Sequence, residues 1–296
     1  MVNYLLIALI ILLYSLQTLF CTGFNNGYAG DKALASPVFN IIEGFFIALV
    51  TLCFIGFRFA PSPVTVIIGC LNAIALFGYN TSMLKASESG SYAFMCLSYL
   101  VGGFVVPLIV DSFVSTPITL PQWCCIGGML AAFVLINIEM VNLHGASLKY
   151  YVYCAVLFVC NGAYGSLVKV QTVFMESESQ QMVVITYGMT GLIALVSLIA
   201  KEKGGTLRAF AGCKGKAVPP LAGCLLVSAF AVNALVYVMP LVDLAVLNPS
   251  LDGGVLLVSA AFARLVYKER FTVLKTVGLL IATAMIVVLN LLGTAA

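Results

Sequence analysis

The sequence predicts an all-α integral membrane protein of about ten transmembrane helices, built as two inverted repeats of five helices. Of its 296 residues, 62% are hydrophobic and only 8% are charged, whereas a soluble domain carries roughly 25% charged residues. Apolar runs of about 20 residues, the length that crosses the hydrocarbon layer, alternate with short polar joints. Glycine pairs also recur in the two halves at one common offset. Lipid is therefore the expected solvent.

Ten segments have the length and composition of a membrane span. Prolines stand at or near the start of several of them, where a helix is expected to begin. Two joints are short, so the pattern also allows nine or eleven spans. The predicted spans are Val2–Phe20, Val38–Phe57, Val64–Leu84, Tyr92–Val110, Trp123–Val141, Tyr151–Val170, Met182–Ala200, Leu221–Met239, Leu251–Tyr267 and Val273–Leu292.

Internal repetition divides the chain into two halves. A shift of 151 residues places Gly102–Gly103 on Gly253–Gly254. With five spans in each half, this offset predicts a duplication, with one repeat over residues 1–145 and the other over residues 146–296. An odd number of spans per repeat inverts the second copy in the membrane. Inverted repeats are typical of transporters, which bind their substrate near the midplane of the bilayer.

Polar side chains inside the spans are the candidates for a substrate pocket, because a polar group at the centre of a membrane helix should face a cavity or a partner. Asn233 and Tyr237 are four residues apart, so they share one face of a helix. Amides, hydroxyls and aromatic rings together suit a small polar or zwitterionic solute. The candidates are Asn72, Tyr79, Asn80, Tyr99, Asn161, Tyr164, Asn233, Tyr237, Asn248 and Asp252.

A structural role competes with solute contact at each of these positions. Amides and hydroxyls also hold membrane helices together, and tyrosines near span ends occupy the membrane interface. Asp252 can alternatively favour the positive N-terminal end of its helix. The four glycines Gly102, Gly103, Gly253 and Gly254 either permit close helix contact or act as hinges in alternating access.

Two charged residues within the spans need a separate explanation. Glu43 lies about two turns into the second predicted span, where an ionised carboxylate costs roughly 2.5–3.5 kcal/mol on insertion scales. We therefore expect it to be able to exchange a proton during transport, with a capping or snorkelling acid near Pro37 as the alternative. Lys169 ends the sixth predicted span and is expected to snorkel toward the interface.

Catalytic and metal sites are not expected. The cysteines lie mostly inside apolar runs, where a thiol behaves as a small hydrophobic group, and the sequence holds one histidine, His144. Neither a Cys-x-x-Cys pair nor a Gly-x-x-x-x-Gly-Lys-Ser/Thr motif occurs. The sequence therefore predicts no cofactor, no nucleic-acid partner and no enzymatic activity. An intramembrane enzyme would be the alternative, and any His-based chemistry would depend on His144.

A short motif in the second half adds a family resemblance. Asn248–Ser250 is followed by Tyr267–Thr272, which contains Glu-Arg, and then by Gly278. This pattern resembles the C-terminal EamA repeat of the drug/metabolite transporter superfamily, in which a Gly-Glu-Arg-like turn ends the ninth span and a glycine opens the tenth. In the first half, Ser115–Pro117 stands where that turn would lie. The resemblance implies a ten-helix transporter that carries small metabolites, usually outward.

The predicted function is that of a secondary transporter that exports a small molecule. The protein is expected to be a multi-pass protein of the cell membrane, and its expected partners are the small-molecule substrate and membrane lipids. A lipid-carrier flippase of the same superfamily is the alternative, and monomer or homodimer is left open. The basic residues near the span ends lie mostly in the odd-numbered joints, and the even-numbered joints hold only Arg58 and Lys169. The positive-inside rule then places the odd joints in the cytoplasm, whereas the family resemblance implies both termini inside.

Overall fold

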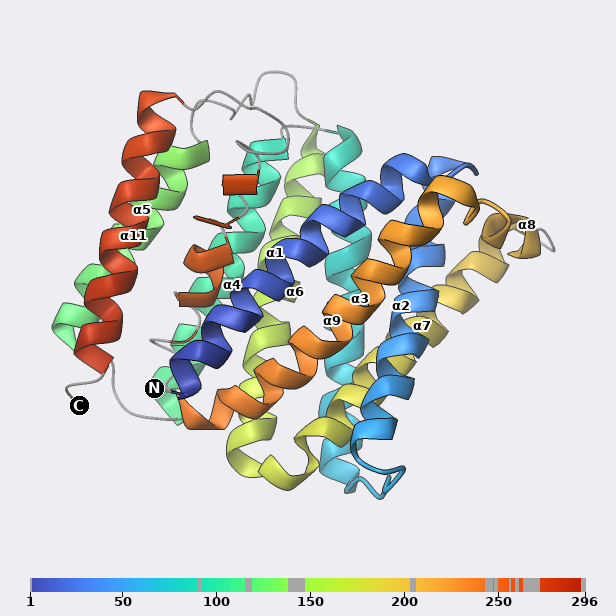
Figure 1. Ribbon diagram of the computed structural model, residues 1–296, viewed down its shortest axis with the longest axis horizontal. Coiled ribbons are helices and arrows are strands. Elements are labelled where there is room, and N and C mark those ends of the chain that lie inside the picture. Colours follow the sequence, from blue (N-terminus) through green and yellow to red (C-terminus); the bar gives the residue numbers. More distant parts are fainter. Residues whose placement is uncertain are drawn as a thin grey trace. The chain divides into compact units, whose positions relative to one another are not determined.

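The structure is a computed structural model, and the regular elements in its described part are helices (Figure 1). The described residues are 2–89, 92–114, 119–137, 147–202, 206–242, 247, 250–255, 257–258, 261–262 and 272–293. The α-helices are α1 (Val2–Gly27), α2 (Lys32–Phe54), α3 (Pro63–Ser89), α4 (Tyr92–Val114), α5 (Leu120–Asn137), α6 (Leu148–Phe174), α7 (Ser179–Glu202), α8 (Thr206–Phe210), α9 (Val218–Val238) and α11 (Val273–Gly293). Short 3-10 turns are η2 (Glu176–Glu178), η3 (Gly215–Ala217) and η4 (Met239–Leu241).

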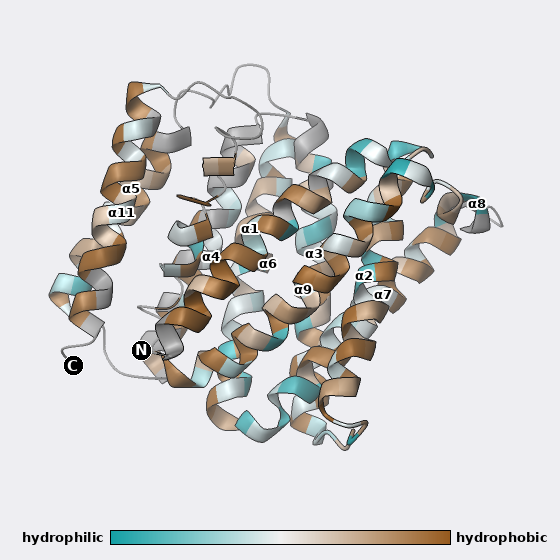
Figure 2. Cartoon of the chain, in the orientation of Figure 1, coloured by the Kyte–Doolittle hydropathy of each residue, from teal (hydrophilic) through white to brown (hydrophobic). Residues whose placement is uncertain are grey.

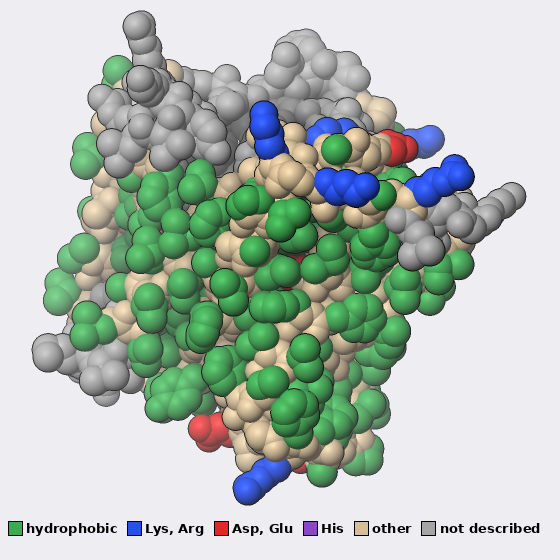
Figure 3. All heavy atoms as spheres, turned by 45° about the vertical axis from the view of Figure 1, so that its right-hand side comes forward, with side chains coloured by type: hydrophobic (Ala, Val, Ile, Leu, Met, Phe, Trp, Pro, Cys, Tyr) green, Lys and Arg blue, Asp and Glu red, His purple; other side chains and the backbone are tan. Residues whose placement is uncertain are grey.

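Within the described residues, six helices are long and apolar enough to cross a membrane, and Figure 2 shows hydrophobic residues along most of their length. On the face drawn in Figure 3, hydrophobic side chains cover the middle, and charged side chains lie toward two opposite ends. Such an apolar outer surface requires a hydrocarbon solvent. The chain is therefore an all-α, multi-pass membrane protein. The six segments are Leu5–Gly27, Lys32–Phe54, Pro63–Met83, Leu148–Phe174, Glu176–Lys201 and Gly215–Leu241.

The expected helical class is confirmed, and nine of the predicted spans coincide with helices of the described chain. Six of these meet the length and hydropathy of a membrane span, and Leu120–Leu135 and Thr276–Val288 are shorter apolar helices. The ninth predicted span, Leu251–Tyr267, is described only in part, at residues 251–255, 257–258 and 261–262. The count of ten spans therefore stays a prediction.

Local chemistry explains where α2 and α3 begin and end. Asp31 caps α2, and its side chain accepts a hydrogen bond of 3.0 Å from the backbone N–H of Ala33, as N-cap residues do. After α2 the chain turns at Gly56, whose φ of +61° is accessible to glycine without steric cost. Pro63 then opens α3, at the first helical position where its missing N–H costs nothing.

The chain forms two compact units, and each combines segments from both predicted repeats. Unit 1 contains residues 1–12, 82–170 and 238–296, and unit 2 contains residues 13–81 and 171–237. The predicted halves 1–145 and 146–296 describe a duplication in the sequence, whereas these units describe which helices contact one another.

In unit 2, α2 packs along α7. Their shared core contains the buried side chains Val38 and Ile41 of α2 and Ala194 and Leu198 of α7. The two backbones come close at Gly44, where an added Cβ would lie 2.6 Å from the carbonyl oxygen of Tyr187. A small residue is therefore required at this crossing, as is common where membrane helices meet.

In unit 1, α5 packs along α11, and the two lie side by side in Figure 1. Their core is formed by Met129 and Phe133 of α5 and Ala282 of α11, together with smaller neighbours. Helices α4 and α6 of the same unit approach closely at Gly102, because an added Cβ there would collide with the backbone of Phe158. These contacts provide the rigid frame on which the polar residues are held.

Candidate functional site

The most unusual polar group in unit 2 is the carboxyl of Glu43. It is 8% exposed and stands eleven residues after the start of α2 at Lys32, which is about 17 Å along the helix. Gln17 of α1 donates a hydrogen bond from Nε2 to Oε1 of Glu43 at 3.3 Å, and Ser228 of α9 also bonds to the carboxyl. We call Glu43, Gln17 and Ser228 the Glu43 cluster.

Among the described residues, a thiol lies next to the Glu43 cluster. Ser228 is fully buried, and its Oγ lies 3.9 Å from the thiol of Cys224. The thiol of Cys224 also donates to the carbonyl oxygen of Gln17 at 3.7 Å. Because Gln17 and Ser228 are neutral, neither offsets an ionised carboxylate, and a buried charge without a partner is expensive. The carboxyl therefore suits a bound proton or a cationic ligand.

Burial and depth also weigh against the alternative explanation of Glu43 as a capping or snorkelling acid. Six residues separate it from Pro37, near the start of α2, and the helix continues to Phe54. A snorkelling side chain keeps its charged end in water, whereas this carboxyl contacts two other helices through Gln17 and Ser228.

A second polar contact joins the same two helices α2 and α9. Asn233 donates from Nδ2 to Oγ1 of Thr51 at 3.0 Å and to the carbonyl oxygen of Ala229 at 2.8 Å. Its Oδ1 is buried without a hydrogen-bond partner, although buried acceptors are normally satisfied. Asn233 thus ties α9 to α2 and leaves one acceptor free for a donor that a ligand can bring.

The remaining candidates of unit 2 fall into different surroundings. Asn80 donates to Oδ1 of Asn40 at 2.6 Å, which links α3 to α2. Asn72 is buried, donates from Nδ2 to the sulfur of Met182 at 3.7 Å, and has an unpartnered Oδ1. Tyr79 is half-buried on α3.

Tyr237 is 61% exposed, whereas Asn233 is 7% exposed. Four residues advance a helix by about 400°, so the two directions differ by about 40°. Near the end of α9 at Val238, this difference takes the tyrosine ring to the outside. Asn233 and Tyr237 were expected to line one pocket, and of the two only Asn233 has a buried side chain.

In unit 1, the predicted candidates lie on α4, α6 and the segment around residue 252. Asn161 donates from Nδ2 to the carbonyl oxygen of Tyr99 at 2.8 Å, so the amide joins α6 to the backbone of α4. Tyr164 and Asp252 are half-buried. Asn248 lies outside the described residues, as does His144.

The four predicted glycines of unit 1 all have close neighbours, which are backbone atoms at Gly102 and side-chain atoms at the other three. An added Cβ would collide with Phe158 at Gly102 and with the amide of Asn161 at Gly103. At Gly253 it would lie 2.6 Å from Met129, and at Gly254 2.5 Å from Ile11. These surroundings favour the packing alternative over the hinge.

Several residues of the site were missed by the sequence analysis. Gln17, Asn40, Thr51 and Ser228 are polar side chains inside predicted spans, so the rule that selected Asn72 would have selected them too. Lys169 was expected to snorkel at the end of its span, but it is 4% exposed. The reason is that α6 continues to Phe174, five residues beyond the lysine, so Lys169 lies inside the helix.

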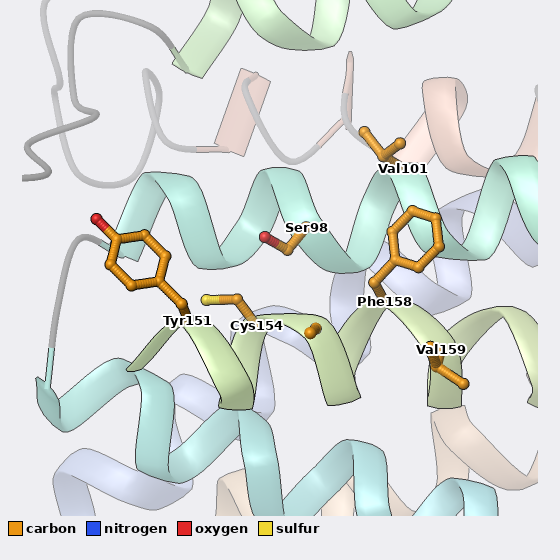
Figure 4. Close-up of a pocket in the computed structure, with 7 residues that line it drawn as sticks. Ser98, Val101, Tyr151, Cys154, Phe158 and Val159 are labelled. Carbon is orange, nitrogen blue, oxygen red and sulfur yellow. The ribbon is translucent and has the colours of Figure 1, made fainter. Parts of the chain in front are cut away.

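A surface groove lies along the contact between α4 and α6 in unit 1 (Figure 4). It has a volume of about 390 Å³. In Figure 4, Tyr151 and Ser98 stand toward one end, and Val101, Phe158 and Val159 toward the other. The lining is mainly apolar, with few hydrogen-bonding groups, and therefore differs from the Glu43 cluster. The lining residues are Ser98, Val101, Tyr151, Cys154, Ala155, Phe158 and Val159.

Comparisons with known proteins identify the fold and no more. No protein-family model matches the chain, and no curated protein matches its sequence. A solved structure, described only as the crystal structure of a protein, superimposes with a TM-score of 0.68 at 15% identity, over 99% of this chain and 98% of that one. At this identity the similarity shows a shared fold alone. The class defined by the helices is therefore a multi-pass, all-α membrane protein with a buried carboxyl in one unit.

Proposed function

We propose that this protein is a secondary transporter that moves a small polar solute across the cell membrane, outward, by alternating access. The observation that carries the proposal is that, in each unit, a helix packs along the helix at the equivalent position of the other predicted repeat. In unit 2 the pair is α2 and α7, and in unit 1 it is α5 and α11. Such pairing is expected of helices that lie near the two-fold pseudo-axis of an inverted repeat.

The equivalence of these helices follows from their positions in the chain. Ser179, which begins α7, follows Lys32, which begins α2, by 147 residues. Val273 of α11 follows Leu120 of α5 by 153 residues. Both separations lie close to the glycine offset of 151 residues seen in the sequence. A duplication with small length changes in the joints accounts for all three.

Two glycines support the same relation at the level of single residues. Gly44 of α2 and Gly191 of α7 are also 147 residues apart. An added Cβ on Gly44 would lie 2.9 Å from the backbone nitrogen of Gly191. Equivalent glycines thus face each other where the two helices cross, as they would if a pseudo-axis passed near that point.

The repeat is not symmetric in its chemistry. At the same offset, Glu43 corresponds to Thr190, whose hydroxyl donates to the carbonyl oxygen of Thr186 at 2.7 Å within its own helix. One repeat therefore supplies a carboxyl, and the other supplies a satisfied hydroxyl. In the proposed transporter, Glu43 binds the coupling proton or a cationic group of the solute. This scaffold and the sequence resemblance are the grounds for placing the chain in the drug/metabolite transporter superfamily.

Ligand-dependent stability provides the first test. The purified protein is unfolded by heat in the presence of amino acids, nucleosides, sugars, polyamines and organic cations. A solute that binds only the folded state raises the apparent stability by RT ln(1 + [L]/Kd), which is about 2.7 kcal/mol at a hundredfold excess over Kd. We expect one chemical class to raise the unfolding temperature and then to show counterflow in proteoliposomes. Stabilisation without counterflow would refute transport.

The alternative is a lipid-carrier flippase, and the groove between α4 and α6 is the observation that favours it. A flippase needs a laterally accessible groove, and this one lies on the exposed side of α6, where Val159 of the lining is 59% exposed. Translocation of a fluorescent polyprenyl-phosphate lipid in proteoliposomes, without any response to soluble metabolites, would replace the transporter proposal.

A further inference from the structure

We infer that a group of exposed basic residues at one end of unit 2 binds the phosphate head group of an anionic phospholipid. The inference does not depend on the transport function proposed for the Glu43 cluster. It rests on the position of these residues at the ends of membrane spans, on the contacts that hold their joints together, and on their excess of positive charge. We call the group the basic platform, and its members are Lys32, Lys201, Arg208, Lys214 and Lys216, all exposed.

The basic platform lies where four candidate membrane spans begin or end. Lys32 is the first residue of one span, Lys201 is the last residue of another, and Lys216 is the second residue of a third. The ends of membrane spans lie at the level of the lipid head groups. Lipid phosphates are therefore the anions that surround these side chains. The four spans are Leu5–Gly27, Lys32–Phe54, Glu176–Lys201 and Gly215–Leu241.

Direct contacts join the two joints that carry the platform. Tyr28, between α1 and α2, is 3% exposed, and its hydroxyl donates to the carbonyl oxygen of Ala209 at 2.6 Å. Arg208 directly precedes Ala209. An added Cβ at Gly27 would lie 2.8 Å from the carbonyl oxygen of Lys216. Basic residues that are far apart in the sequence therefore lie around the same end of α1.

Apolar contacts anchor both joints to the helices. Ala217 packs with Tyr28 in one buried cluster, and Ala209 packs with Leu198 of α7 in another. The backbone that carries the basic side chains is thus fixed before any ligand arrives. A head group that contacts both joints does not have to order them, which lowers the entropic cost of binding.

Lys32 is itself held in place by the end of α1. Its ammonium donates to the carbonyl oxygen of Tyr28 at 3.0 Å and to that of Asn25. A lysine has three N–H donors, so one donor and the full positive charge are left for an anion. The side chain is therefore oriented in advance by two bonds to the protein.

Positive charge exceeds negative charge at this end of unit 2. Residues 28–32 and 201–217 contain six basic residues and two acidic ones, which leaves a net charge of +4. One of the two acids, Asp31, accepts the backbone N–H of Ala33 at 3.0 Å and caps α2. An anionic head group is attracted by this excess, whereas a zwitterionic head group without net charge gains little from it.

A lipid fits this surface better than an acidic soluble protein does. Acyl tails already hold a lipid phosphate at the level of the span ends, so the basic residues need no further contact surface to bind it. Each Lys or Arg near a membrane surface changes the affinity for anionic lipid about fivefold. We therefore expect a preference for phosphatidylglycerol over phosphatidylcholine with identical acyl chains.

The test measures lipid binding by native mass spectrometry and by unfolding temperature in detergent with added lipid. Lys214→Gln and Lys216→Gln should each lose about fivefold in affinity for phosphatidylglycerol, and the double variant about 25-fold. Lys214→Arg/Lys216→Arg keeps both charges and should bind as the wild type does. The matched control is Arg58→Gln, which removes one charge from the exposed residue beyond the opposite end of α2 and should keep full affinity.

A second variant changes the contact between the joints and leaves the charge unaltered. An added Cβ at Gly212 would lie 2.5 Å from Cζ of Tyr28, so Gly212→Ala should push the two joints apart and weaken phosphatidylglycerol binding. Gly127→Ala, which has open space, is its control. Full affinity in Gly212→Ala would overturn the inference.

Two further results would also overturn the inference. One is equal binding of phosphatidylglycerol and phosphatidylcholine by the wild type. The other is an equal loss of affinity in Lys216→Gln and Arg58→Gln, which would show that only the total charge of the protein matters. Unfolding temperatures without added lipid verify that each variant is folded.

Discussion

Glu43 is a carboxylic acid in the middle of a membrane helix, with hydrogen bonds from Gln17 and Ser228 and no positive charge among these partners. An uncharged carboxyl can keep both bonds at little cost, whereas an ionised one lacks compensation. The carboxyl in this position is expected to lose its proton only when a cation binds in place of the proton or when the proton is passed on. In the proposed transporter, we therefore expect Glu43 to couple the movement of the solute to that of a proton.

Substitutions of Glu43 should separate its structural and functional roles. Glu43→Gln preserves the shape and both hydrogen bonds, so we expect its free energy of unfolding to stay within about 1 kcal/mol of wild type. Glu43→Ala leaves buried groups of Gln17 and Ser228 unpaired and should cost about 1–3 kcal/mol. Chemical unfolding in detergent provides both values.

The same Glu43→Gln variant tests coupling. Its amide cannot exchange a proton, so the pH dependence of solute transport in proteoliposomes should disappear while counterflow of the solute persists. Ser228→Ala is the matched control, because it removes a hydrogen bond to the carboxyl but keeps the titratable group. A pH dependence that is unchanged in Glu43→Gln would eliminate proton coupling through this residue.

Glu178 shows how a charged residue at a helix end performs a structural task. Its Oε2 accepts hydrogen bonds from the backbone N–H and the hydroxyl of Ser62, at 2.9 and 2.7 Å, and from the hydroxyl of Thr65 at 2.5 Å. A carboxylate at the beginning of a helix satisfies free N–H groups and complements the helix dipole. The contact thus ties η2 to the first turn of α3.

The unfolding temperature should depend on this contact between Glu178 and the start of α3. Glu178→Gln keeps an acceptor but loses the negative charge, and Glu178→Ala loses both, so we expect stability to fall progressively from wild type through Gln to Ala. Glu176→Ala is the matched control, because Glu176 is exposed in the same 3-10 turn. Equal unfolding temperatures for Glu178→Ala and Glu176→Ala would remove the proposed contribution.

At the scale of helices, close approach depends on glycines whose surroundings differ sharply. Gly44 lies against the backbone of α7, while an added Cβ at Gly127 of α5 would have no atom within 4 Å. Both are helical and neither has a positive φ, so backbone strain does not distinguish them. The difference between them is therefore a difference of space.

Alanine at these two positions should have opposite effects. Gly44→Ala forces α2 and α7 apart and should cost about 1–3 kcal/mol, as overpacking does. Gly127→Ala should be neutral or stabilising by up to about 1 kcal/mol, because alanine is the better helix former. Unfolding of both variants under identical detergent conditions makes the comparison. Equal destabilisation of the two would show that space at the α2–α7 crossing is not limiting.

At the largest scale, the joints between the helices of unit 2 lie in two groups. The joint between α1 and α2 contacts the joint between α7 and α9, since the hydroxyl of Tyr28 donates to the carbonyl oxygen of Ala209 at 2.6 Å. The joint between α2 and α3 instead meets the joint between α6 and α7, through Ser62 and Glu178. Basic side chains of unit 2 belong mainly to the joints of the first end or to the helix turns next to them. They are Lys32, Lys201, Arg208, Lys214 and Lys216.

This distribution predicts an orientation in the membrane. By the positive-inside rule we expect the basic end in the cytoplasm and Arg58 in an external joint. In a background without native cysteines, a membrane-impermeant maleimide added to intact cells should label Arg58→Cys and spare Lys214→Cys. Permeabilised cells, in which both should react, are the control. The reverse pattern would support the family resemblance, with both termini inside, over the charge distribution.

The sequence by itself determined the solvent and the class of this protein. Apolar runs long enough for a bilayer require helices, because lipid offers no partner for a free backbone group, and nine of the predicted spans accordingly coincide with described helices. The depth of Glu43 was also readable from its position within a run. These properties depend on residues close together in the chain.

Only the tertiary structure decided which polar groups meet. Gln17 and Ser228 are distant from Glu43 in the sequence, and the periodicity of one helix says nothing about which neighbour its polar face contacts. For the same reason the outward position of Tyr237 and the burial of Lys169 were not foreseen. In a membrane, every face of a helix is apolar enough for lipid, so hydrophobicity alone does not distinguish inside from outside, and close contacts between helices make that choice.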